Sequence, residues 1–246
     1  MNARALGLRI ASLGGAVVLW WFATAVLWST NPVLSEMGPA DAVPSLVAHL
    51  VDGNGLDDVR TSLTRLLAGL LVAVAAGVPF GVLLGTRPGF ESATSPIVNF
   101  MRMISPIAWA PVVIVAIGIG DGPVVFLVAV TAVWPVALGT AAGVRQVAPG
   151  WHAVARSLGA TRREELLHVT VPAVRGNVLT SLRLALGVGW IVLVPAEMLG
   201  VDSGLGYSVL NARDQLDYSK LGATVLLIGM IGFGLDLAVR RVLRRA

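Results

Sequence analysis

The side chains that could carry out chemistry are few in this chain, and they are not spaced as a catalytic or metal site. The histidines, His49, His152 and His168, do not share the spacing of metal ligands, and the absence of cysteine excludes disulfides and thiolate metal sites. The only lysine, Lys220, follows a serine, so there is no GxxxxGKS/T phosphate-binding loop, and neither GxSxG nor HExxH occurs. We therefore expect no catalytic residue, no metal ligand and no cofactor bound by this chain.

Charged residues are instead concentrated in residues 144–173, in a chain of which only 13% is charged. This stretch predicts two short helices separated by a break at Gly159, because glycine tolerates backbone angles that other residues avoid. Thr161 is expected to cap the second helix, with Glu164 completing a capping box three residues later, and Pro172 is expected to close the unit. Two short helices that expose charge indicate a docking element.

The composition indicates that these charges are positioned by a membrane protein. The 246 residues are 56% hydrophobic, with a mean hydropathy of +0.81, and a soluble protein of this size would need far more charge to cover its surface. The net charge of +4 does not indicate nucleic-acid binding, because most cations flank apolar runs. We predict an all-α integral membrane protein with six transmembrane helices, at residues 10–28, 63–84, 97–119 (interrupted by Pro106 and Pro111), 124–140, 178–199 and 221–239.

The loops between these spans differ in charge and predict an orientation. Residues 31–60 and 200–220 are expected to be acidic loops outside the cell, whereas most arginines lie on the other side. By the positive-inside rule, both termini and residues 144–173 are then cytoplasmic. The first apolar run is interpreted as a span, with a cleaved signal peptide as the alternative. We group residues 1–60 as an N-terminal helix with an external loop, and residues 61–246 as a core domain with five spans.

Several charged side chains fall within the predicted spans, where a charge at the helix centre costs about 2.5–3.5 kcal/mol on insertion scales. Arg65, Arg102 and Arg183 lie near span ends, from which their side chains could reach the membrane surface. Asp236 precedes Arg240 by one helical turn and is expected to pair with it. Each of these charges must therefore face protein or water.

Glu197, beside a proline at the outer end of the fifth span, has two interpretations. It could mark the external mouth or gate of a pathway, or it could serve as a structural hydrogen-bonding group. Three tryptophans also lie within spans, where they could line a central vestibule or merely pack against protein and lipid. The candidate pathway residues are Trp109, Trp134, Trp190, Glu197, Arg102 and Arg183.

The segment ARSLGA at 155–160, followed by Val171-Pro172, resembles the EAA loop of permease subunits of ABC importers. The resemblance continues through SLTRLLAGLLVAVAAGVPFGVLLG at 62–85, RMISPIAWAPVVIVAIGIG at 102–120, LRLALGVGWIVLVPAEMLG at 182–200 and GLGY at 204–207. In this order the motifs are specific, and they are most similar to the nitrate/sulfonate/taurine/bicarbonate branch. One departure is that Ala153, Val154 and Ala155 stand where the family loop has Glu-Ala-Ala, so the acid is missing.

The resemblance implies a permease of the type I ABC importer kind in the plasma or inner membrane, which is not itself an enzyme. The implied partners are a cytoplasmic ABC ATPase dimer that uses ATP and Mg, a second and identical permease copy, an extracytoplasmic solute-binding protein and membrane lipid. The implied substrate is a small solute such as an organic sulfonate, taurine, nitrate or a similar anion. The implied ATPase-coupling residues are Ala155, Gly159, Ala160, Thr161, Arg162, Arg163, Glu164, Glu165, Leu166, Val169 and Pro172.

An ion-coupled secondary transporter is the alternative function. Such a protein needs ionisable groups or broken helices near the membrane midplane, often in an inverted repeat. Here the charges lie toward span ends, and no clear repeat relates the two halves. A subunit of a membrane enzyme complex is a third class, but no cofactor motif supports it.

Overall fold

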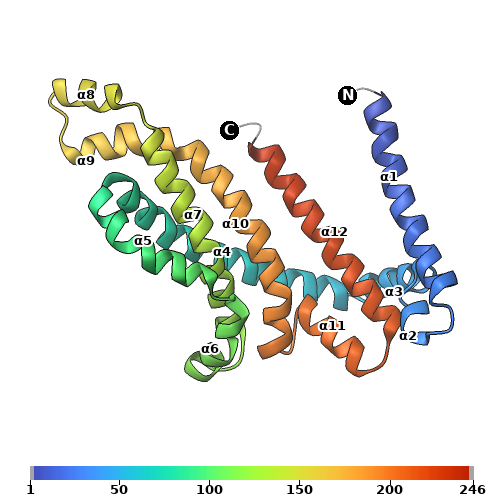
Figure 1. Cartoon of the computed structure of the whole chain (residues 1–246). Helices are drawn as coiled ribbons and strands as arrows, with labels where there is room; N and C mark the ends of the chain where they lie inside the picture. Colours follow the sequence, from blue (N-terminus) through green and yellow to red (C-terminus); the bar gives the residue numbers. More distant parts are fainter. Residues whose placement is uncertain (1–2, 244–246) are drawn as a thin grey trace. The chain divides into compact units, whose positions relative to one another are not determined.

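The computed structural model describes residues 3–243, and this part of the chain contains helices and no strand, which confirms the all-α prediction (Figure 1). Contacts between residues group the chain into two compact units. The first consists of the chain up to Thr61 together with Ser203–Ile231, and the second of Ser62–Asp202 together with the chain from Gly232 onward. Two helices, α4 (Asn54–Thr86) and α12 (Tyr218–Leu243), contribute residues to both units.

The first unit consists of an N-terminal apolar helix and several shorter ones. Besides parts of α4 and α12, it contains α1 (Ala3–Phe22), the π-helical turn η1 (Ala23–Leu27), α2 (Pro32–Ser35), α3 (Pro39–Val51) and α11 (Leu205–Asp214). Most of residues 31–60 and 200–220, which were expected to be external loops, are therefore helical, and the side of the membrane on which they lie stays a prediction.

Local patterns explain why helices form in these polar stretches. The side-chain oxygen of Asn31 accepts a hydrogen bond from the Val33 N–H at 3.0 Å, which starts α2. In α3, the buried residues Ala42, Leu46 and His49 follow one another at helical spacing, so that the helix buries one face although its sequence carries acids and an internal proline.

The second unit contains the remaining helices. They are α5 (Pro88–Met103), the 3₁₀ turn η2 (Pro106–Trp109), α6 (Ala110–Ile117), α7 (Asp121–Gln146), α8 (Pro149–Ser157), α9 (Arg162–Glu165), the π-helical turn η3 (Leu166–Thr170) and α10 (Val171–Gly200). Glycines on α4 let α7 lie directly against its backbone: a Cβ added at Gly81 would come within 2.3 Å of the Ala137 carbonyl oxygen. Close approach of this kind is how helices associate where lipid supplies no hydrophobic driving force.

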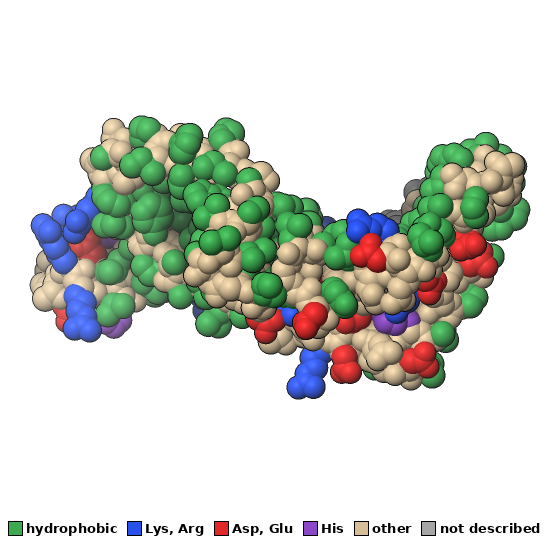
Figure 2. Space-filling model, turned by 90° about the horizontal axis from the view of Figure 1, so that it is seen from below, with side chains coloured by type: hydrophobic (Ala, Val, Ile, Leu, Met, Phe, Trp, Pro, Cys, Tyr) green, Lys and Arg blue, Asp and Glu red, His purple; other side chains and the backbone are tan. Residues whose placement is uncertain are grey.

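The six predicted spans each correspond to an apolar helical segment of the described residues. Four segments are long and apolar enough to cross a membrane, namely Asn54–Thr86, Asp121–Gln146, Arg162–Gly200 and Tyr218–Arg241. The pair α5 and α6 makes a fifth if it is counted as one broken span, and Ala11–Leu27 is a shorter apolar helix. Hydrophobic side chains cover much of the face seen in Figure 2, as expected of a surface that meets lipid.

The third predicted span is not one straight helix, because α5 and α6 are bent by 87° relative to each other. Ile104 and Ser105 are extended, with ψ angles of 128° and 126°. Pro106 excludes the helical conformation from the residue before it, so α5 has to end here. The interruption at Pro106 was expected from the sequence, whereas the size of the bend was not.

The expectation that Pro172 closes the charged unit is wrong. The chain is helical from Arg162 to Gly200 without a break, and Pro172 lies in the first turn of α10. The π-helical turn η3 comes immediately before it, and the Val171 N–H donates to the Leu166 carbonyl, five residues back. This wider turn accommodates a proline that lacks a donor and would clash inside a regular helix.

Candidate functional site

The charged stretch folds into a hairpin of α8 and α9, called here the α8–α9 hairpin (residues 149–170). Between the helices, Gly159 has a φ of +82°, and its N–H donates to the Arg156 carbonyl while the Ala160 N–H donates to the Ala155 carbonyl, both at 3.0 Å. These two bonds form a Schellman motif, which favours glycine at this position. A Cβ added at Gly159 would meet no atom within 4 Å, so the requirement for glycine comes from the backbone angle alone.

The predicted capping box is confirmed at the start of α9. The Thr161 N–H donates to Glu164 Oε2 at 2.8 Å, and the Glu164 N–H donates to Thr161 Oγ1 at 3.3 Å. The hydrogen bond from the Thr161 backbone, followed by that from its hydroxyl, lowers the pKa of the Glu164 carboxyl. The helix start is therefore fixed by the hairpin's own residues.

An additional contact, not expected from the sequence, ties the two arms of the hairpin together. Nδ1 of His152 on α8 lies 2.5 Å from Oε1 of Glu165 at the end of α9, and both side chains are partly buried. The resemblance implied Glu165 as a coupling residue, but the sequence suggested no partner for its side chain within the hairpin. The Glu165 carboxylate thus contacts α8, the helix in which Ala153, Val154 and Ala155 replace the Glu-Ala-Ala of the family loop.

One face of α8 is apolar and exposed. Trp151, Val154 and Leu158 are 66%, 53% and 82% exposed, and their spacing of three and four residues places them in one stripe along the helix. Arg156 on the same helix, away from this stripe, and Arg162 and Arg163 at the start of α9 are exposed and make the hairpin surface positively charged. Exposed apolar residues flanked by charge are typical of a surface that binds another protein.

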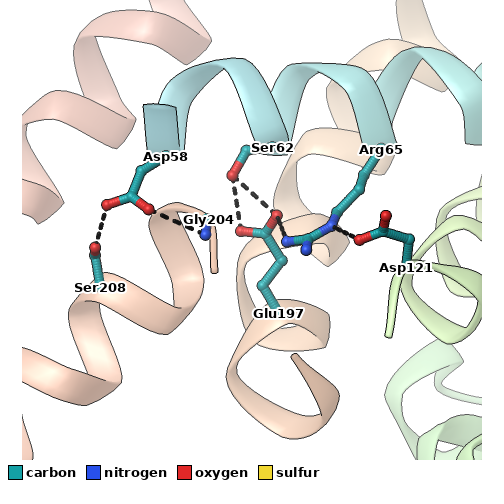
Figure 3. A network of polar contacts seen from close by, with 7 residues as sticks. All are labelled: Asp58, Ser62, Arg65, Asp121, Glu197, Gly204 and Ser208. Carbon is teal, nitrogen blue, oxygen red and sulfur yellow. Dashed lines mark hydrogen bonds and ion pairs between the residues drawn. The ribbon is translucent and has the colours of Figure 1, made fainter. Parts of the chain in front are cut away.

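A buried ion pair lies within the spans of the second unit (Figure 3). The Arg65 Nη1 donates to Glu197 Oε1 at 2.9 Å, and the Arg65 Nε donates to Asp121 Oδ1 at 2.7 Å. The hydroxyl of Ser62, one turn before Arg65 on α4, lies 2.9 and 2.8 Å from the two oxygens of Glu197. Arg65 is 4% exposed and Glu197 is fully buried, whereas Asp121 is 72% exposed.

This arrangement contradicts the expectation for Arg65 and bears on the two interpretations of Glu197. Arg65 does not extend to a membrane surface, because it is buried and paired with carboxylates from α7 and α10. Glu197 makes the hydrogen bonds that its structural interpretation requires. Its place at the mouth of a pathway stays a prediction.

A second carboxylate acts within the first unit, at the N-terminus of α11 (Figure 3). Asp58 accepts hydrogen bonds from the Gly204 N–H, at 3.1 Å, and from the hydroxyl of Ser208. A carboxylate is favourable at this end of a helix because it meets unpaired N–H groups and the positive end of the helix dipole. The sequence could have suggested this only through the Gly204 turn, which does not identify the partner.

His49 lies beside Asp58 and is buried, with 7% of its side chain exposed and 3.6 Å between its Nε2 and Asp58 Oδ2. Among the residues that the structure describes, none forms a hydrogen bond with Nε2. Burial lowers the pKa of His49, and the charge of Lys220 lowers it further, while Asp58 and Asp52 oppose the shift. His49 therefore favours the neutral form.

The predicted pair of Asp236 and Arg240 is confirmed, with 2.7 Å between Arg240 Nε and Asp236 Oδ2. Arg183 joins it, since its Nε donates to Asp236 Oδ1 at 2.9 Å. The Arg183 and Asp236 side chains are each 36% exposed. Arg183 is thus anchored to α12 and does not stand alone at a span end.

The second unit contains a half-open cavity of about 770 Å³ between α5, η2, α7 and α10. It brings together three of the candidate pathway residues, Arg102, Trp109 and Trp134, but not the other three. Trp190 is instead buried against α12, where a Cβ at Gly232 would lie 2.6 Å from its Nε1. The cavity is lined by Met101, Arg102, Ile104, Pro106, Trp109, Phe126, Val130, Thr131, Trp134, Pro135, Leu184, Val188, Ile191 and Val192.

Comparison with known proteins finds a family model over most of the chain. Residues 77–246 match the family described as binding-protein-dependent transport system inner membrane component. The chain is 32% identical to the taurine transport system permease protein TauC of Escherichia coli, over 99% of this chain and 90% of TauC. It is 31% identical to the bicarbonate transport system permease protein CmpB of Synechococcus elongatus, over 93% of this chain and 85% of CmpB.

Solved structures support the fold. An inward-facing form of the MetNI methionine ABC transporter matches with a TM-score of 0.67 at 21% identity, over 77% of this chain and 94% of that chain. A bacterial ABC transporter involved in the import of the acidic polysaccharide alginate matches with a TM-score of 0.66 at 15% identity, over 98% of this chain and 96% of that chain. The helices therefore have the arrangement of an ABC importer permease.

Proposed function

The chain belongs to the family of binding-protein-dependent transport system inner membrane components, and from this premise we propose that it forms, as one of two identical copies, the pathway of an ATP-driven importer for a small anion. The membrane-spanning helices and the permease relatives already make it a permease subunit of an ABC importer in the membrane. The finer parts of the proposal are the docking site, the substrate class and the orientation.

The α8–α9 hairpin is the proposed docking site for a separate cytoplasmic ATPase dimer, which binds ATP and Mg. The observation that carries this proposal is that the hairpin holds its own shape, through the Schellman motif at Gly159, the capping box and the His152–Glu165 contact. The exposed stripe of Trp151, Val154 and Leu158 supplies an apolar surface for the partner. The docking residues remain those that the resemblance implied, from Ala155 to Pro172.

A rigid hairpin is what energy coupling requires. An ATPase can shift a permease between two conformations only by as much as its affinity for the two differs. If the hairpin deformed on docking, the free energy of ATPase binding would be spent on that local deformation. A rigid hairpin instead transmits its displacement to α10, with which it forms one continuous helix. Loss of the brace should therefore reduce coupling more than it reduces folding.

The proposed substrate is a small anion such as an organic sulfonate, taurine or nitrate, received from an extracytoplasmic binding protein. The names of the relatives support this class, because they include taurine, bicarbonate and nitrate permeases. The proposed orientation places the α8–α9 hairpin and both termini in the cytoplasm, on the argument that arginines collect on that side.

The docking proposal can be tested at Gly159. Gly159→Val should release the ATPase subunit during co-purification and abolish stimulation of ATP hydrolysis by the loaded binding protein, because a β-branched residue cannot adopt a φ near +82° without strain. Gly159→Asn should retain both properties, since asparagine tolerates left-handed angles. Gly150→Ala is the matched control within α8, where a Cβ meets no atom within 4 Å and the backbone angle is ordinary. Wild-type docking and hydrolysis in Gly159→Val would overturn the proposal.

A further inference from the structure

The walls of the cavity between α5, η2, α7 and α10 are almost entirely apolar. Of the lining side chains, only Arg102 and Thr131 carry a charge or a hydroxyl, while Trp109, Phe126 and Trp134 contribute aromatic rings. The Thr131 hydroxyl donates to the Leu127 carbonyl at 2.7 Å, so its proton is used within α7. A volume of about 770 Å³ falls within the range of small-molecule pockets.

Among the described residues that line this cavity, Arg102 is the one cation and none is a carboxylate, and the Arg102 side chain is exposed at the cavity's open side. It lies in the last turn of α5, where the helix dipole favours a positive charge. A guanidinium group binds the oxygens of carboxylate, sulfonate and phosphate groups through paired, charge-assisted hydrogen bonds. The cavity thus offers one strong point of attachment for an anionic group, beside a large apolar surface.

We propose that this cavity binds an organic anion whose carboxylate or sulfonate group contacts Arg102 and whose apolar body lies against Trp109 and Trp134. The inference rests on the proposed function and narrows its substrate class. Nitrate or bicarbonate has no apolar body to lie against the tryptophans, so it would gain from this cavity only the contact with Arg102. The ammonium group of taurine would find no counter-ion among the lining residues and would lie near a second positive charge.

The test measures separately how much the anionic group and the apolar body of the ligand contribute to binding. The purified complex of this permease with its ATPase is titrated with methane-, butane- and hexanesulfonate at constant ionic strength, and binding is followed by tryptophan fluorescence, since two tryptophans line the cavity. Affinity should rise roughly fourfold for each added CH₂ group that enters an apolar site. Taurine and nitrate should produce no saturable change over the same concentrations.

Two variants show which residue is responsible for each contribution to the binding affinity. Arg102→Gln should weaken every sulfonate by about tenfold or more while leaving the increment per CH₂ unchanged, because it removes a charge-assisted bond only. Trp134→Ala should reduce that increment and leave methanesulfonate nearly unaffected. Arg87→Gln, an exposed arginine just before α5 and outside the cavity lining, is the matched control and should bind as the wild type does.

The outcomes distinguish this inference from the proposed function. Retained ATPase docking with no saturable sulfonate binding, with equal response to taurine, or with wild-type affinity in Arg102→Gln overturns the cavity assignment and leaves the permease function standing. Failure of the wild-type permease to bind any ATPase overturns the proposed function itself. A chain-length increment that depends on Trp134, together with a uniform loss in Arg102→Gln, supports the inference.

Discussion

Removing the charge of Glu197 tests whether the buried ion pair stabilises the second unit. In Glu197→Gln, Arg65 keeps its exposed partner Asp121 but loses its buried carboxylate, and Arg65 itself is only 4% exposed. Breaking a buried pair from one side costs about 3–5 kcal/mol, because the remaining charge stays desolvated. With roughly 2–4 °C per kcal/mol for a chain of this size, the melting temperature should fall by about 6–20 °C.

The measurement is thermal unfolding of the purified protein in detergent, followed by tryptophan fluorescence. Glu91→Gln is the control, because it breaks an ion pair between α5 and α7 whose partners, Glu91 and Arg145, are 40% and 43% exposed. An exposed pair contributes about 0–1 kcal/mol, so this shift should stay below roughly 4 °C. The double variant Arg65→Gln/Glu197→Gln should lose less than the sum of the single variants, since it leaves no unpaired charge in the buried site and Asp121, which loses its partner, is exposed. The reasoning is refuted if Glu197→Gln melts no lower than Glu91→Gln.

Three further outcomes follow from contacts elsewhere in the chain. Because the pKa of His49 is lowered from 6.5, the unfolded chain takes up its proton first, so stability is complete above that value and falls as the pH drops through it. The wild type should thus melt lower at about pH 5.5 than at about pH 7.5, and His49→Gln should lose much of that difference; an unchanged pH dependence in the variant contradicts this. Thr161→Ala should speed amide exchange at Glu164 about fivefold by removing the cap, whereas Thr180→Ala, an exposed threonine of α10, should leave that amide unchanged. Gly81→Val should destabilise by about 1–3 kcal/mol or prevent assembly, because its Cβ meets a backbone oxygen, whereas Gly187→Ala, which meets no atom within 4 Å, should be neutral or stabilising; equal melting temperatures would speak against close α4–α7 packing.

Features set by neighbouring residues could be predicted from the sequence. The break at Gly159, the capping box of Thr161 and Glu164, and the pair of Asp236 and Arg240 all involve residues within one or two helical turns, and all are observed. The apolar runs likewise predict where the spans lie, because a long uninterrupted apolar sequence has few other stable environments. In each case the chemistry that decides the structure is contained in the local sequence.

Features set by distant residues could not be predicted in this way. Arg65 and Glu197 are 132 positions apart, and a charge inside a span indicates that a partner exists without indicating which one. The same holds for Asp58 and the start of α11. The continuation of the helix through Pro172 depends on a widened turn before it, which a single proline in a sequence does not reveal.

The unbroken helical run from Arg162 to Gly200 has a mechanical consequence. It comprises 39 residues, about 58 Å at the usual rise of 1.5 Å per residue. One end carries the capped arm of the hairpin, and Glu197, with its buried partner Arg65, lies within a turn of the other end. A displacement of Arg162 is therefore transmitted to Glu197 along one continuous helix. The widened turn at Leu166–Thr170 is the part of this helix that bends most easily.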